Sequence, residues 1–195
     1  MSSAVGPFSL DRMVRAVERV RDRLLRAAAA LNAAHIPYAV VGGNAVALWV
    51  SRVDDSAVRN TRAVDVLIGR EDLDTVRKAL EAAQFVYRRV GGIEMFLDGP
   101  DAKPRDAIHI IFVNEFVREG ELMPNPDVTD SEDSGEYRVI SLAGLVRIKL
   151  TAFRDKDRTH LRDLIDVGLV DPTRLNRVPP SLCERLRSLL DTPGR

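Results

Sequence analysis

A glycine pair followed by asparagine is the first segment of the chain whose residue types are suited to binding a ligand. Gly42, Gly43 and Asn44 come directly after an apolar run at residues 38–41. A glycine pair lets the backbone approach a ligand closely, and the free N–H groups at the start of a helix attract phosphate. The segment therefore predicts a strand, a turn and a phosphate-binding helix N-terminus capped by Asn44; an ordinary turn without a ligand is the alternative.

Asp65 is the acidic residue of a second such segment. Thr61, Arg62 and Ala63 precede it, and residues 64–68 form an apolar run around it. Residues i and i+2 of a strand point to the same side of a sheet, so positions 63 and 65 share a face. Two carboxylates at this spacing can hold divalent metal ions, which bind phosphates and activate an incoming hydroxyl. Here only Asp65 is present, because position 63 offers a methyl group.

Apolar patterns along the chain predict the elements that position these two segments. Short apolar runs predict strands at residues 38–41, 63–68, 85–89, 93–97, 107–113 and 137–140, with a hairpin turn at Gly91 and Gly92. Amphipathic runs predict helices at residues 10–33, 44–50, 72–83, 141–153 and 157–167 and from Pro179 onwards, the first capped by Ser9 and the fourth by Ser141. This order indicates an α/β or α+β domain, with a mixed sheet flanked by helices and a helical C-terminal portion.

The same patterns predict how the chain is divided. We expect one domain over residues 1–195, made of an N-terminal helix (1–35), a sheet core (36–140) and a helical C-terminal portion (141–195). The polar segments 51–60 and 114–135 are expected to be loops. The N-terminal helix is expected to pack on the core through one apolar stripe and to expose a charged face. The stripe consists of Met13, Val17, Val20, Leu24, Ala28 and Leu31.

The composition limits the classes of function, although it leaves a local basic patch open. The 195 residues carry no formal net charge, which gives no overall electrostatic argument for binding nucleic acid or a membrane surface. Cys183 is the only cysteine, so an intrachain disulfide and a cysteine metal cluster are excluded. No apolar run is long enough to span a bilayer, and the N-terminus lacks the pattern of a signal peptide. We therefore expect a cytoplasmic protein without a membrane partner.

Three stretches of the chain together carry the pattern of a known family. They are residues 40–45 with the glycine pair, residues 59–67 with Asp65, and residues 150–157 followed by Asp163 and Leu164. With them the chain resembles the polymerase-beta-type nucleotidyltransferase superfamily over residues 36–171, and within it the small bacterial proteins grouped with the abortive-infection nucleotidyltransferase toxins. The resemblance implies a nucleotidyltransferase-like fold. It also implies transfer of a nucleoside monophosphate from a nucleoside triphosphate (NTP) such as ATP to an acceptor, with Mg²⁺ or Mn²⁺.

The resemblance implies a set of residues that contact the triphosphate. These are Gly42, Gly43, Asn44, Thr61, Arg62 and Lys149. Lys149 would neutralise charge that develops on the phosphates, and a surface lysine is the alternative. Arg62, together with Arg59, would clamp phosphates or guide an RNA acceptor, and two solvated side chains are the alternative.

The resemblance also implies which residues perform catalysis and bind metal. Asp65 matches the second carboxylate of the family's pair, and Ala63 stands where the first is expected. His109 stands at the position of a third carboxylate, although imidazole suits Mg²⁺ less well than a carboxylate does. Asp65 and His109 are thus the candidate metal ligands, with Asp106 and Glu94 as substitutes for the third carboxylate.

Ala63 has two competing explanations. In the first, the chain is a natural pseudoenzyme that keeps the fold for binding. In the second, an aspartate has been replaced deliberately to silence a toxic or reactive enzyme, which the well-matched flanking residues favour. In both cases we expect severely reduced nucleotidyl transfer.

The resemblance also implies partners for the reaction. The acceptor would be an RNA, such as a transfer RNA, or a protein. The chain would then act as a toxin of a toxin–antitoxin or phage-defence system, with an antitoxin as its partner. A non-catalytic module that binds a nucleotide or another protein is the main alternative, and a purely structural domain is a third.

Overall fold

Seven strands form one mixed sheet in the computed structural model, which describes residues 8–192 of the chain. Their order across the sheet is β3-β4-β5-β2-β1-β7-β6. β2 lies at the centre, antiparallel to β1 and parallel to β5, and β1 runs parallel to β7. The strands are β1 (Tyr38–Val41), β2 (Val64–Ile68), β3 (Val86–Val90), β4 (Ile93–Leu97), β5 (Ile108–Phe112), β6 (Ser131–Asp133) and β7 (Arg138–Ile140).

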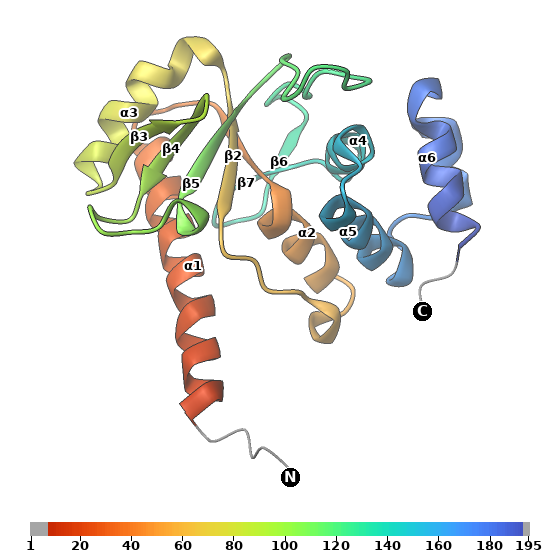
Figure 1. The fold of residues 1–195 in the computed structure, drawn as a ribbon, viewed down its shortest axis with the longest axis horizontal. Coiled ribbons are helices and arrows are strands. Elements are labelled where there is room, and N and C mark those ends of the chain that lie inside the picture. Colours follow the sequence, from red (N-terminus) through yellow and green to blue (C-terminus); the bar gives the residue numbers. More distant parts are fainter. Residues whose placement is uncertain (1–7, 193–195) are drawn as a thin grey trace.

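Helices cover both faces of this sheet (Figure 1). They are α1 (Phe8–Ala33), α2 (Gly42–Ser51), α3 (Leu73–Ala82), α4 (Leu142–Ala152), α5 (Asp155–Asp166) and α6 (Pro180–Leu190). α1 and α3 lie on one face, and α2, α4 and α5 lie on the other, with α6 outside α4 and α5. Within residues 8–192, none of the helices combines the length and the apolar character that crossing a bilayer requires.

Successive side chains of β2 face two different apolar cores, one on each side of the sheet. Val64 and Val66 are fully buried against the α1 and α3 side, whereas Leu67 is buried against α2, α4 and α5. Successive side chains of a strand point to opposite faces, so Asp65 shares the second face with Leu67. The apolar residues of β2 therefore fix the register that directs Asp65 toward the helices of the C-terminal part.

The sequence predicts this architecture well. The α/β fold class is confirmed, and six of the seven strands lie within two residues of their predicted bounds. β6 was expected to be part of a loop, because its sequence Ser131-Glu132-Asp133 has no apolar residue. The strand is recognised by its pairing with β7. The hairpin turn at Gly91 and Gly92 is confirmed, with both residues at positive φ.

α1 departs from its predicted role over its first half. Leu24, Ala28 and Leu31 are buried on the sheet, but Met13 and Val17 are 57% and 40% exposed. The helix has 26 residues, and its N-terminal end projects past the sheet in Figure 1. The first residues of the apolar stripe therefore have no sheet to pack against. The predicted cap Ser9 is also wrong, since the helix begins before it.

Candidate functional site

The glycine turn lies directly against β2. Gly42 has a φ of +68°, which a residue with a side chain adopts only at a cost. A Cβ at Gly42 would lie 2.0 Å from Oδ2 of Asp65, and a Cβ at Gly43 would lie 2.7 Å from Oγ1 of Thr61. Gly42 is thus required by conformation as well as by close approach, whereas Gly43 is required by close approach alone. Four residues of the predicted site therefore come together, and we call Gly42, Gly43, Thr61, Asp65 and the adjoining His109 the glycine–Asp65 junction.

The left-handed conformation of Gly42 also explains why α2 starts earlier than predicted. The chain turns from β1 into α2 within one residue, so Val41 is the N-cap and Asn44 already lies inside the helix. Asn44 is 9% exposed, and its Nδ2 donates a hydrogen bond of 2.8 Å to the carbonyl oxygen of Ala63. Asn44 therefore ties α2 to the entry of β2 and does not cap the helix as predicted.

His109 lies beside Asp65 because β5 runs parallel to β2 with these two residues opposite each other. Nδ1 of His109 is 3.4 Å from Oδ1 of Asp65, and Nε2 is 3.0 Å from the carbonyl oxygen of Pro104. Both oxygens are acceptors, so the ring makes both bonds only when both of its nitrogens carry a proton. The side chains of Asp65 and His109 remain 15% and 26% exposed.

The pKa shifts of this pair agree with its geometry. The hydrogen bond to Asp65 raises the pKa of His109 above its ordinary value, although burial acts in the opposite direction. Burial by itself raises the pKa of Asp65, but the His109 hydrogen bond and the charges of Lys156 and Lys149 outweigh it, so that pKa lies below its ordinary value. Both shifts favour an imidazolium next to a carboxylate, the state in which His109 makes both of its hydrogen bonds.

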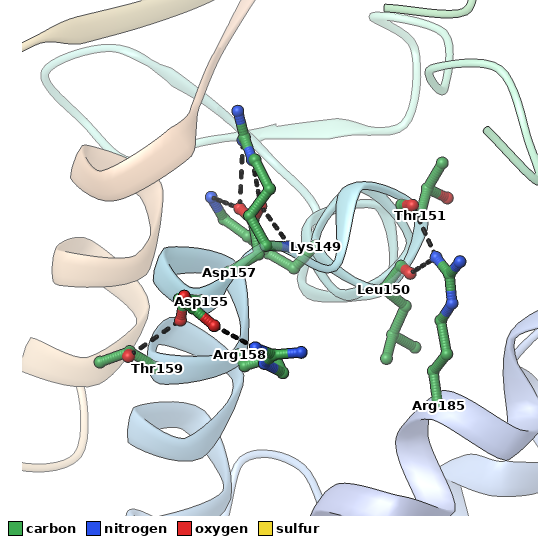
Figure 2. A network of polar contacts seen from close by, with 9 residues as sticks. Lys149, Leu150, Thr151, Asp155, Asp157, Arg158, Thr159 and Arg185 are labelled. Atoms are coloured by element: carbon green, nitrogen blue, oxygen red, sulfur yellow. Dashed lines mark hydrogen bonds and ion pairs between the residues drawn. The ribbon is translucent and has the colours of Figure 1, made fainter. Parts of the chain in front are cut away.

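A second charged group lies between α4 and α5. Figure 2 shows Lys149 and Asp157 pointing toward one another from these helices. The Nζ of Lys149 is 3.0 Å from Oδ1 of Asp157, and the Nε of Arg154 is 2.6 Å from Oδ2. Phe153, at a φ of +46°, ends α4 and turns the chain so that these side chains meet. We call Lys149, Arg154 and Asp157 the α4–α5 ion cluster.

Burial distinguishes this cluster from surface ion pairs. Lys149 is 3% exposed and Asp157 is fully buried, so Lys149 is not the surface lysine of the alternative prediction. Burial lowers the pKa of Lys149, and its ion pair with Asp157 partly counteracts this. For Asp157, burial acts to raise the pKa, but the bonds from Arg154 and Lys149 prevail and lower it. The charge of Lys149 also acts on Asp65, which links the cluster to the glycine–Asp65 junction.

His160 is a neighbour of this cluster that was not predicted as a site residue. Its Nδ1 is buried and has no hydrogen-bond partner among residues 8–192. Burial, followed by the charges of Lys149 and Lys156, lowers the pKa of His160 to about 4. The available signal was its spacing on α5, three residues after Asp157 and four after Lys156, which places all three on neighbouring positions of one helix.

The two predicted arginines have different surroundings. The Nε of Arg59 donates to both carboxylate oxygens of Asp163, at 2.8 and 2.9 Å. Arg59 is thus anchored to α5 through Nε while 64% of its side chain stays exposed, and its predicted contact with phosphates or RNA stays a prediction. Arg62 is exposed, and its carbonyl oxygen accepts a hydrogen bond of 3.2 Å from Arg23.

Glu94 is excluded as a substitute for the third carboxylate. Met95, not Glu94, lies opposite His109 in the sheet, so Glu94 points to the other face. There it is 4% exposed, accepts a 2.5 Å hydrogen bond from the hydroxyl of Tyr87 and pairs with Arg89 at 3.2 Å. Asp106 lies in the turn before β5, where its carboxylate is 3.8 Å from the Nε of Arg105.

These residues do not fit a two-metal site. Within the described part of the chain, no group of three His, Cys, Asp or Glu side chains is arranged to hold a metal ion. Asp65 offers one carboxylate, with Oδ1 facing His109 and Oδ2 against Gly42. His109 directs both ring nitrogens at oxygen acceptors, and a histidine needs a free nitrogen lone pair to bind a metal.

A groove of about 290 Å³ lies beside the junction, between α1 and α2. Its mainly apolar lining includes Val20, Leu24, Leu48 and Tyr137, and it reaches Asn44 and Thr61 at one end. Asp65 and the two glycines are not part of this lining. The groove therefore meets the junction at Thr61.

Comparisons with known proteins bear on the fold. No protein-family model and no curated protein sequence matches the chain. Its structure is similar to the solution structure of the antibiotic-resistance factor ANT(2'')-Ia, with a TM-score of 0.56 and 12% identity over 89% of this chain and 91% of that one. It is also similar to a crystal structure of an antigenic nucleotidyltransferase-like protein from Paracoccidioides brasiliensis, with a TM-score of 0.61 and 18% identity over 90% of this chain and 89% of that one.

These similarities establish that the chain has a nucleotidyltransferase-like fold, as the sequence predicted. At identities of 12% and 18% the likeness extends to the fold alone. The narrower resemblance to abortive-infection toxins stays a prediction.

Proposed function

We propose that the chain binds a nucleoside triphosphate at the glycine–Asp65 junction, in a nucleotidyltransferase site whose transfer step is severely impaired. The contact between Gly42 and Asp65 is the observation that supports this proposal most directly. It places a bare backbone turn, the first turn of α2 and the inward carboxylate of β2 at one point. In this position the N–H groups of α2 meet an anion, as helix N-termini do.

Positive side chains supply the rest of the proposed phosphate site. Lys149 and Lys156 act electrostatically on Asp65, and His109 touches it. Lys149 is held in place by Asp157, so its charge is oriented before any ligand arrives. Preorganised charge of this kind stabilises a phosphate without the cost of reorganising the site.

The impaired transfer step follows from position 63. The fold family places a carboxylate there to bind metal, and in-line transfer depends on the resulting charge stabilisation. Ala63 supplies no charge. The residues present therefore bind and orient a triphosphate, and they lack the groups that would activate an acceptor hydroxyl.

The acceptor and the biological setting remain as the sequence resemblance implies them. An RNA, such as a transfer RNA, or a protein would receive the nucleotide in a form of the chain with an intact site. A toxin–antitoxin or phage-defence role, with an antitoxin as partner, follows from the same resemblance. These parts of the proposal are tested only after triphosphate binding is established.

Calorimetric titration with each of the four ribonucleoside triphosphates tests the binding proposal. Gly42→Ala should weaken binding of the preferred triphosphate by about tenfold or more, equivalent to about 1.4 kcal/mol, because its methyl group displaces Asp65. Gly92→Ala is the matched control, since Gly92 also has a positive φ but has no atom within 4 Å of an added Cβ. Absence of binding by the unmodified chain, or equal affinity in the two variants, would overturn the proposal.

A further inference from the structure

We infer that the glycine–Asp65 junction binds the triphosphate without a divalent cation, with side chains of the protein in the place of the metal ions. This inference rests on the proposed function and specifies the charge on which that function depends. It follows from the disagreement between the residues present and the metal site that the fold family implies.

The first observation is the engagement of both possible metal ligands. Oδ1 of Asp65 faces Nδ1 of His109, and Oδ2 lies against Gly42. Nε2 of His109 faces the carbonyl oxygen of Pro104 at 3.0 Å. A metal ion at Asp65 would have to displace the imidazolium, and His109 would have to rotate and lose a proton to become a ligand.

The second observation is the balance of charge around the junction. Four cationic groups act on this region and three carboxylates oppose them, which leaves an excess of one positive charge. The cations are His109, Lys149, Arg154 and Lys156, and the carboxylates are Asp65, Asp157 and Glu121, which acts on Arg154. A site made of several carboxylates needs metal ions before a phosphate can approach, whereas this one attracts an anion directly.

The third observation is that two neighbouring strands both lack a carboxylate that the family pattern has. Ala63 removes one carboxylate, and His109 replaces another with a cation at the neighbouring position of β5. Each change alone would leave a defective metal site. Together they exchange the charge of metal ions for the charge of an imidazolium held next to Asp65.

Titration of ATP in the presence of EDTA and in the presence of MgCl₂ tests this inference. We expect the dissociation constant in EDTA to equal the value in MgCl₂ within about twofold, or to be lower, because Mg²⁺ neutralises part of the charge that the site recognises. His109→Gln should weaken binding in EDTA by about fivefold or more. His35→Gln, at an exposed position after α1, is the matched control and should not change the affinity.

Binding of Mn²⁺ alone, followed by electron paramagnetic resonance, supplies the second readout. The unmodified chain should leave Mn²⁺ free, and the double variant Ala63→Asp/His109→Asp should bind it. Thermal melts of all variants verify that they are folded. If the double variant does not fold, Mn²⁺ binding by the unmodified chain still decides the test.

The outcomes distinguish this inference from the proposed function. ATP affinity that is tenfold or more tighter in MgCl₂, or Mn²⁺ binding by the unmodified chain, would overturn the inference and leave the nucleotide site standing. An absence of binding by all four ribonucleoside triphosphates under both conditions would overturn the proposed function and the inference with it.

Discussion

Asp157 and Asp65 are both acted on by the charge of Lys149, yet the protein holds them in opposite ways. Asp157 is fully buried and accepts bonds from Lys149 and Arg154 through both of its oxygens. Asp65 keeps 15% of its side chain exposed and, among residues 8–192, has one polar contact, at 3.4 Å, with His109. The α4–α5 ion cluster is thus closed, and the glycine–Asp65 junction is open to a ligand.

This difference separates a structural carboxylate from a ligand-binding one. Removing one partner from a buried ion pair leaves an uncompensated charge, which is costly to the folded state. Removing a partly exposed charge changes stability little, because water and salt already screen it. We therefore expect substitutions in the cluster to act mainly on folding and substitutions in the junction mainly on nucleotide binding.

Asp157→Asn should have the largest effect on stability. The substitution keeps the shape of the side chain but leaves the buried ammonium of Lys149 without a counter-charge, at a cost of about 3–5 kcal/mol. Urea denaturation followed by circular dichroism measures the change in the free energy of unfolding. Asp155→Asn is the matched control, because Asp155 is on the same helix, is 93% exposed and pairs with Arg158 at the surface. Similar losses for both variants would contradict the structural role of Asp157.

Lys149→Met should lower the free energy of unfolding by an amount between those of Asp157→Asn and Asp65→Asn. Asp157 keeps its bonds from Arg154 in this variant, so about 1–3 kcal/mol should be lost. The variant should also weaken ATP binding, since it removes a cation that acts on the junction. Lys78→Met, at an exposed position on α3, is the control for both measurements. A lower free energy of unfolding together with unchanged ATP affinity would show that Lys149 acts only within the α4–α5 ion cluster and not on the nucleotide.

His160, which lies near the α4–α5 ion cluster, should make the free energy of unfolding depend on pH. Its pKa is about 4 in the folded protein and 6.5 in a free side chain, so the unfolded chain binds more protons between these values. The stability contributed by neutral His160 is complete above pH 6.5 and is lost as the pH falls toward 4. His160→Leu should flatten the stability profile over this range, while His35→Leu should not. An unchanged profile in His160→Leu would show that other groups dominate the acid response.

Asp65→Asn should have the smallest effect on stability, below about 1 kcal/mol, because Asp65 has one weak polar contact and partial exposure. The side chain keeps its shape against Gly42, so the turn should remain intact. Denaturation in parallel with Asp157→Asn gives the comparison directly. A loss as large as that of Asp157→Asn would show that the two carboxylates play the same structural role.

The contrast between the two regions also explains how much the sequence could predict. The glycine turn and β2 were predicted because their signals are local: a glycine pair after an apolar run, and an acid within an alternating strand. The α4–α5 ion cluster was not predicted, because Lys149 meets Asp157 only through the turn at Phe153, where no glycine signals a left-handed residue. Lys149 was therefore left open between a phosphate ligand and a surface residue.

Other differences have the same physical origin. The second hydrogen bond of His109 goes to the carbonyl oxygen of Pro104, a backbone group whose position cannot be predicted from residue types. The exposure of Met13 and Val17 depends on where the sheet ends relative to α1. Tertiary contacts decided these features, whereas local patterns decided the strands.

Mapping of backbone amide shifts by NMR during titration with ATP tests the central claim, that the junction is the triphosphate site. We expect the largest shifts at Gly42, Gly43 and Asn44, followed by the side-chain signals of His109. Shifts confined to the groove between α1 and α2, around Val20 and Leu48, would place the ligand elsewhere and contradict the account.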